Sequence, residues 1–148
     1  MVVDADVLAA DLLVDGVERT VGDRLRSHSW LDLVASDALL GRAEAVIAAV
    51  VDADLATAWH DRIDDERIAV DHPPGDHPGL ASAYRGNAAH LVTGEESLRS
   101  VETGATVRRY VDLSIRSPDA FRRSFDPSRL YPMVVGGTYP GPDRDPRA

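Results

Sequence analysis

Short apolar runs alternate with longer amphipathic runs along this chain of 148 residues. The short runs have the length of β-strands buried on both faces, and the longer runs carry apolar residues at helical spacing. Alternation of this kind is typical of βαβ units, in which helices connect parallel strands and cover the sheet. We therefore predict an α/β protein with three layers, α/β/α, around a central and mainly parallel sheet.

The limits of these runs predict the individual elements. Strands are expected at Val2–Asp4, Leu31–Ala35, Ile68–Val70, Leu91–Thr93 and Val111–Ile115. Helices are expected at Val7–Val14, Val17–Ser27, Asp37–Val50, Ala53–Arg67 and Pro78–Arg85. Ser36 precedes the third of these helices and is suited to cap it.

The composition changes after Phe125, so residues 1–124 are expected to form the domain. Prolines and glycines recur in the rest of the chain and predict no regular structure there. Apolar residues such as Tyr131, Met133 and Tyr139 are too frequent for a solvated linker. We expect residues 125–140 to pack on the domain or on a second subunit, and residues 141–148 to form a disordered tail.

Acidic residues stand where the predicted strands and helices meet. Asp4 ends the first strand, Glu95 follows the fourth strand, and Asp76 precedes the Ala-rich helix between them. Functional groups gather at the carboxyl ends of parallel strands, and clustered carboxylates repel one another unless they surround a cation. Mg²⁺ or Mn²⁺ suits such an all-oxygen site. Asp4 and Asp76 could each instead cap the helix that follows.

These segments resemble the PIN-domain family of metal-dependent nucleases. That family opens with an apolar strand that runs into Asp-Thr-Asn-Val-Leu, and residues 4–8 here read Asp-Ala-Asp-Val-Leu. Its later signature is close to Gly-Asn-Ala-Asp-Tyr-Leu-Val-Thr-Gly-Asp, and residues 86–95 read Gly-Asn-Ala-Ala-His-Leu-Val-Thr-Gly-Glu. A last strand at 111–115 with a short helix at 117–121 is also a common family ending. The resemblance covers residues 1–124.

The resemblance implies a metal-dependent ribonuclease. Asp4, Asp76 and Glu95 would be the catalytic residues that hold Mg²⁺ or Mn²⁺. Asp6 would lie close to Asp4, and Thr93 would orient the carboxylate of Glu95. RNA would be the substrate. Many small members of the family are toxins that pair with a small antitoxin protein. A homodimer is a further candidate assembly, because residues 125–140 could pack on a second subunit.

The main departure from the family lies in the helix after the second predicted strand. The family has a Glu in the second turn of the helix after the second strand, and the same spacing from Ser36 reaches Arg42. An Arg at this place would pair with Asp4 or Asp76 and reduce the need for a cation. The alternative function is therefore a catalytically degenerate PIN-like domain that acts in RNA or protein binding.

Two Asp-His pairs, Asp71-His72 and Asp76-His77, lie close together in the sequence. Histidine beside aspartate can indicate a transition-metal site. The prolines around both pairs favour a rigid loop instead, so we expect the histidines to have no metal role.

The charge of the chain is strongly acidic. Asp and Glu number 25 against 16 basic residues, nineteen of the acids are Asp, and the chain contains Arg but no Lys. Such a surface suits concentrated salt, where screening reduces repulsion, although an Arg-biased codon supply would also remove Lys. A net charge of −9 usually argues against nucleic acid. If the acidic residues serve to hydrate the surface, the net charge does not decide whether the chain binds nucleic acid. The local placement of Arg then decides it.

Other features narrow the class of protein. Absence of Cys excludes disulfides and thiolate metal sites. No apolar run approaches the ~18 residues that a membrane-spanning helix needs. The first strand follows Met1 directly, which leaves no room for a signal peptide. We therefore expect a cytoplasmic protein with no membrane partner.

Overall fold

A small parallel sheet forms the centre of the computed structural model, which describes residues 1–108 and 112–147. Its strands are β1 (Val2–Val3), β2 (Leu33–Ser36), β3 (Arg67–Val70), β4 (His90–Val92) and β5 (Ser114–Arg116). β2 pairs with β3, and β4 pairs with both β1 and β5, always in parallel. The two ladders meet where the Val34 N–H donates to the Met1 carbonyl oxygen at 2.8 Å. The three-stranded sheet β1-β4-β5 and the two-stranded sheet β2-β3 therefore adjoin, and the order across both is β3-β2-β1-β4-β5.

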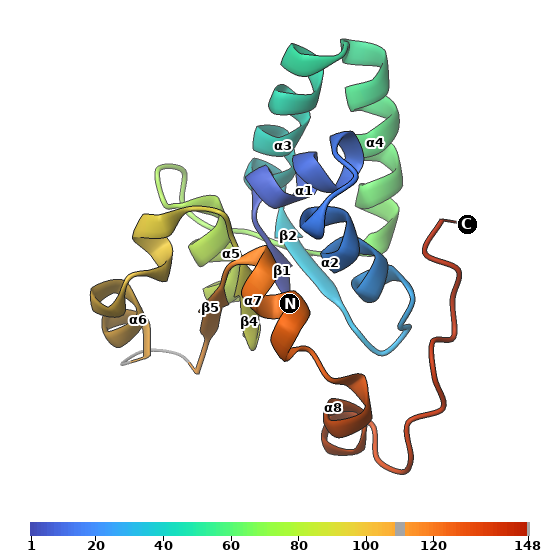
Figure 1. The fold of residues 1–148 in the computed structure, drawn as a ribbon. Coiled ribbons are helices and arrows are strands. Elements are labelled where there is room, and N and C mark those ends of the chain that lie inside the picture. Colours follow the sequence, from blue (N-terminus) through green and yellow to red (C-terminus); the bar gives the residue numbers. More distant parts are fainter. Residues whose placement is uncertain (109–111, 148) are drawn as a thin grey trace.

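Helices cover both faces of this sheet (Figure 1). They are α1 (Ala5–Leu13), α2 (Val17–Arg26), α3 (Asp37–Val50), α4 (Ala53–Glu66), α5 (Pro78–Arg85), α6 (Val101–Arg108), α7 (Pro118–Ser124) and α8 (Pro127–Val134), with a 3₁₀ helix η1 (Glu96–Arg99). The predicted three-layer α/β/α fold with a parallel sheet is confirmed, although the sheet is small.

Alternate residues of β2 show how the two helical layers are arranged. Leu33 lines a hollow together with Leu8 of α1 and Leu25 of α2. Val34 points to the opposite face, where it lies against Gly86 at the end of α5. Because successive side chains of a strand alternate between faces, α1 and α2 cover one face and α5 covers the other. All four residues of β2 are buried, as expected for a parallel sheet covered on both sides.

The sequence signals for α3 and α5 predicted their limits. α3 begins after Ser36, whose hydroxyl oxygen accepts from the Leu39 N–H at 3.1 Å. α5 begins at Pro78, which suits a first turn because its missing N–H needs no partner there. Ser82 and Ala83 of α5 are almost fully buried. Their small size lets this helix lie close to the sheet and brings its first turn near the end of β1.

Several elements differ from the expectation. β5 begins at Ser114, and the expected first residue of that strand, Val111, lies outside the described residues. Helix α8 forms where the prolines predicted no regular structure. Pro127 occupies its first turn, and the carboxylate of Asp126 accepts from the Ser128 N–H at 3.1 Å. A proline in the first turn and a capping aspartate thus start a helix rather than prevent one.

Residues after α8 run back along α2 (Figure 1). The Tyr139 hydroxyl lies 2.6 Å from His28 Nε2, and Asp143 Oδ1 accepts from the Ser29 N–H at 2.8 Å. Arg26 Nε donates to the Pro146 carbonyl oxygen at 3.1 Å. The segment for which a disordered tail was expected therefore makes specific hydrogen bonds through residue 146.

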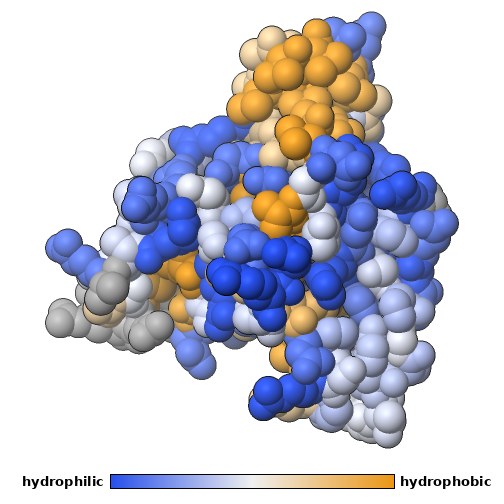
Figure 2. All heavy atoms as spheres, in the orientation of Figure 1, coloured by the Kyte–Doolittle hydropathy of each residue, from blue (hydrophilic) through white to orange (hydrophobic). Residues whose placement is uncertain are grey.

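Helices α3 and α4 form a hairpin that projects from the rest of the molecule. Figure 2 shows apolar surface gathered over its far end. Val46, Val50 and Val51 are exposed there, and these three residues are called the apolar tip below. In the described part of the chain, no helix has the length and apolar character needed to cross a membrane.

Candidate functional site

One point of the sheet is distinguished by the order in which the chain forms its strands. From β1 the chain connects first to β2 and β3 on one side, and then to β4 and β5 on the other. The order therefore reverses between β1 and β4. In open parallel sheets, ligands bind in the crevice beyond the carboxyl ends of the strands at such a point. Asp4 follows β1 and Glu95 follows β4, so both acids stand at this end of the sheet, which is called the acidic crevice below.

Asp4 is the most buried acid of the site, at 2% exposure. Its Oδ1 accepts from the Ala5 N–H at 2.9 Å at the start of α1. Its Oδ2 accepts from the Thr93 hydroxyl at 2.7 Å. A carboxylate buried to this degree must be held by hydrogen bonds, and these two bonds fix its orientation. Asp4 therefore both caps α1 and presents a fixed oxygen to the crevice.

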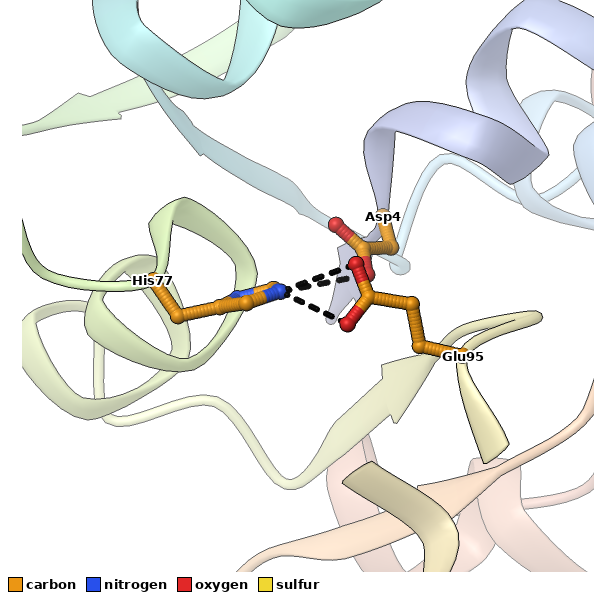
Figure 3. A group of neighbouring side chains, drawn as sticks. All are labelled: Asp4, His77 and Glu95. Atoms are coloured by element: carbon orange, nitrogen blue, oxygen red, sulfur yellow. Dashed lines mark hydrogen bonds and ion pairs between the residues drawn. The ribbon is translucent and has the colours of Figure 1, made fainter. Parts of the chain in front are cut away.

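Asp4, His77 and Glu95 form one group of side chains (Figure 3). One potential ligand atom from each residue lies within 4.8 Å of the others. His77 Nε2 is 3.2 Å from both carboxylate oxygens of Glu95 and 4.0 Å from Asp4 Oδ2. Asp4 comes from β1, His77 from the start of α5, and Glu95 from the turn after β4.

Thr93 connects the two acids of the group. Its hydroxyl donates to Asp4 and also accepts from the Glu95 backbone N–H at 3.0 Å. The side chain of Thr93 is fully buried. This hydroxyl therefore orients the Asp4 carboxylate directly and sets the backbone direction of Glu95.

The hydrogen bonds of His77 identify which ring nitrogen carries the proton. His77 Nδ1 accepts from the Gly79 N–H at 3.1 Å and from the Leu80 N–H at 3.3 Å, which caps α5. A nitrogen that accepts hydrogen bonds carries no proton, so the neutral ring carries its proton on Nε2. Nε2–H therefore donates to Glu95. In this tautomer the Nε2 lone pair is not free for a metal ion.

Asp6 lies beside this group on the first turn of α1. Its Oδ2 accepts from the Gly94 N–H at 3.0 Å, which ties the turn after β4 to α1. Partial desolvation, followed by the charge of Asp4, raises the pKa of the Asp6 carboxyl group, although backbone hydrogen bonds oppose the change. The crevice is thus a region of concentrated negative charge.

Two glycines leave room for these carboxylates. A Cβ atom at Gly79 would lie 2.8 Å from Asp4 Oδ1, and one at Gly94 would collide with Asp6 Oδ2. Larger residues at either position would displace an acid from the crevice.

Asp76 and Arg42 lie outside the group. Asp76 is exposed in the loop before α5. Arg42 is exposed on α3, and within the described residues no ion pair joins it to Asp4 or Asp76. Glu44, two residues further along α3, pairs with His60 Nδ1 at 2.7 Å. The structure thus joins Asp4 and Glu95 as expected, but its third member is His77 rather than Asp76.

A sequence signal could have identified His77. Pro78 is suited to the first position of a helix, and the residue before that position is the N-cap. The N-cap side chain turns toward the helix start, which here faces the sheet. Treating His77 as part of a rigid loop missed this geometry. The same rule places Asp76 one residue before the N-cap of α5.

The arrangement can hold a divalent cation through oxygen atoms. Asp4 and Glu95 each offer a carboxylate oxygen, and these two oxygens lie within 4.8 Å of each other, which suits a single coordination shell. His77 would then support Glu95 from outside the coordination shell, as hydrogen-bond donors to ligating carboxylates often do. Direct coordination by His77 would require loss of its bonds to the first turn of α5.

The fold and crevice together define a class of α/β proteins with an acidic site at the reversal of strand order. Comparison with family models shows more closely where the chain belongs. Residues 1–147 match the model described as "Family of unknown function (DUF7384)", and the chain is a member of that family. Neither the curated proteins nor the solved structures contain a match to this sequence.

Proposed function

We propose that this protein is a PIN-like metal-dependent ribonuclease that hydrolyses RNA phosphodiester bonds. The observation that carries the proposal is the meeting of buried Asp4 with Glu95 at the reversal of strand order. Asp4 and Glu95 would hold Mg²⁺ or Mn²⁺. The resemblance of residues 4–8 and 86–95 to the PIN-domain family supports the choice of reaction.

Each residue of the crevice has a part in this proposal. A bound divalent cation would stabilise negative charge on the scissile phosphate and lower the pKa of a coordinated water. Asp4 is held by Thr93, so its oxygen needs no reorganisation to meet a cation. His77 Nε2–H lies next to Glu95 and can donate a hydrogen bond to that acid or to a phosphate oxygen.

The first experiment measures cleavage of a single-stranded RNA with Mg²⁺ or Mn²⁺. Asp4→Asn and Glu95→Gln should each abolish cleavage, because they remove the charges that hold the cation. The matched controls are Asp76→Asn and Glu96→Gln, which neutralise exposed acids next to the site in sequence. Cleavage that survives Asp4→Asn, or that is lost equally in the controls, would refute the proposal.

A degenerate binding domain is the second candidate, and the His77–Glu95 hydrogen bond favours it. This bond already satisfies Glu95, and only two carboxylates of the group face the crevice. In that case the unmodified protein would bind single-stranded RNA or a protein without cleaving RNA. Fluorescence anisotropy with a labelled RNA, in the presence of Mg²⁺ and of a chelator, distinguishes the two functions.

A protein partner is part of either proposal. The apolar tip presents Val46, Val50 and Val51 to solvent and offers a surface for a small antitoxin protein or a second copy of the chain. We propose a cytoplasmic location for the protein. Sedimentation analysis of the purified chain, alone and with the product of an adjacent small gene, tests these partners.

A further inference from the structure

A second hollow lies away from the acidic crevice. It is formed by β4, β5, α7, α8 and the turn between the two helices, and its volume is about 280 Å³. Its walls include His90, Arg116, Phe121, Arg129 and Met133. None of these residues belongs to the Asp4–His77–Glu95 group. The volume lies near the lower end of the range for small-molecule sites, roughly 300–1,000 Å³, so it suits a ligand of about one ring.

Two guanidinium groups on the walls have no ion-pair partner within residues 1–108 and 112–147. These are Arg116 at the end of β5 and Arg129 on α8. The acid on the same wall, Asp126, uses its Oδ1 to cap α8. In a chain with a net charge of −9, two unpaired arginines at one hollow form a local site for negative charge. Guanidinium groups match the geometry of phosphate and carboxylate oxygens.

His90 adds an unsatisfied polar atom. Its Nδ1 is buried and has no hydrogen-bond partner in the described residues. Buried polar atoms are nearly always paired, so an unpaired one indicates a missing partner. Desolvation first, and then the positive charge of Arg116, lowers the pKa of the His90 ring. The neutral ring adds no charge of its own, so the positive charge of the hollow comes from the arginines.

Apolar surface completes the hollow. Phe121 is buried and its ring meets the His90 ring edge-to-face at 6.3 Å. Met133 stands at the rim and is 83% exposed. If the arginines hold the polar group of a ligand, the apolar part of the same ligand lies against Phe121 and beneath Met133.

We propose that this hollow binds a small organic oxyanion, best represented by a phosphate monoester on an aromatic body. Arg116 and Arg129 donate to the phosphate oxygens, and the His90 ring forms part of the wall beside them. The aromatic body contacts Phe121 and Met133. This site is independent of the nuclease proposal and uses none of the residues of the acidic crevice.

The experiment uses phenyl phosphate as the probe and isothermal titration calorimetry as the measurement. Arg116→Gln and Arg129→Gln should each weaken binding by about ten- to a hundredfold, the range expected for one lost charge-assisted hydrogen bond. Arg123→Gln is the matched control, because Arg123 also lies next to the hollow in sequence but pairs with Asp119. Asp4→Asn should bind the probe as tightly as the unmodified protein.

Two further probes test which part of phenyl phosphate the hollow recognises. Inorganic phosphate should bind more weakly than phenyl phosphate, and phenol should not bind measurably. Ring resonances of His90 should shift on titration with phenyl phosphate. Absence of saturable binding, equal binding of phenol, or equal weakening by Arg123→Gln would each overturn the proposal. Arg129 is exposed, so Arg129→Gln should not disturb folding. If Arg116→Gln impairs folding, the loss of phenyl phosphate binding in Arg129→Gln tests the proposal.

Discussion

His77 shows how one side chain can serve two structural demands. It caps α5 through Nδ1 and donates to Glu95 through Nε2. The two roles are linked, because the acceptor role of Nδ1 places the proton on Nε2. The tautomer therefore links the start of a helix to the hydrogen bonding of Glu95 in the crevice.

Replacing His77 by Asp tests this link. Asp is a good N-cap and should keep α5 intact, while it adds a third carboxylate to the crevice. The affinity for Mg²⁺ or Mn²⁺ should rise on the order of tenfold, about 1.4 kcal/mol, within the range of coupling between neighbouring charges. Titration of Mn²⁺ by electron paramagnetic resonance measures it.

The control for this variant is His77→Asn, which also caps a helix but adds no charge. If both variants bind Mn²⁺ equally, charge at position 77 has no part in the site. Arg42→Glu should leave Mn²⁺ affinity nearly unchanged, because Arg42 is exposed on α3 and outside the group. A strong gain from Arg42→Glu would contradict the geometry described above.

Asp6 gives a prediction about pH. Because its pKa is raised in the folded protein, the folded state holds a proton more tightly than the unfolded state. Its effect on the free energy of unfolding is therefore absent at low pH and becomes destabilising as pH rises above about 4. Asp6→Asn should stabilise the protein at pH 7 but not at pH 3.

Urea denaturation of both proteins at the two pH values measures the difference. Asn retains an oxygen that can accept from the Gly94 N–H, so the contact itself survives the change. A variant that is less stable at pH 7 would show that this hydrogen bond needs the carboxylate.

At the scale of the element, the α3–α4 hairpin is buried where it meets the core and exposed at its far end. Ile47 is fully buried against the core, whereas Val50, three residues later, is 64% exposed. Ile47→Ala should reduce the free energy of unfolding by about 2–5 kcal/mol, because it leaves a cavity. Val50→Ala should change it by less than about 0.5 kcal/mol.

Chemical denaturation of the two variants checks this contrast. Comparable losses would mean that the apolar tip is covered by a partner in solution, since an exposed valine has little packing to lose. The same measurement at several protein concentrations would then reveal a second copy.

Part of the fold could be predicted from the sequence, because some helices carry their capping signals close to their ends. The expected limits of α3 and α5 match the structure, and the start of α3 was predicted from its cap Ser36, because that cause lies next to the helix. The strand order could not be predicted in this way, because it depends on contacts between distant segments. Helix α8 was missed because prolines were treated only as breakers. His77 was missed because its neighbour Asp76 matched a family pattern.

At the scale of the whole molecule, charge is the dominant feature. The chain has 25 acidic residues and a net charge of −9. Several arginines are already paired, as in the bond of Arg26 to Asp11 at 2.6 Å and of Arg122 to Asp119 at 2.7 Å. Such pairs leave an excess of unpaired acids whose mutual repulsion lowers the stability of the folded state.

If the acidic surface is an adaptation to salt, the melting temperature should rise between tenths molar and several molar KCl. Screening of charges extends over only about 3 Å at 1 M salt, compared with about 10 Å at 0.1 M. Differential scanning calorimetry measures the change, and sorbitol at equal osmolality is the control. A melting temperature that stays flat or falls would favour codon supply as the reason for the missing Lys.

The strand order also bears on how the protein is made. β1 lies between β2 and β4, yet translation produces β1 long before β4. While the ribosome is still making α5, β1 can pair with β2 on one side only. Its other edge, with the apolar residues Val2 and Val3, stays open to other nascent chains. A pause in translation between β3 and β4 would therefore be the stage at which this chain most needs a chaperone.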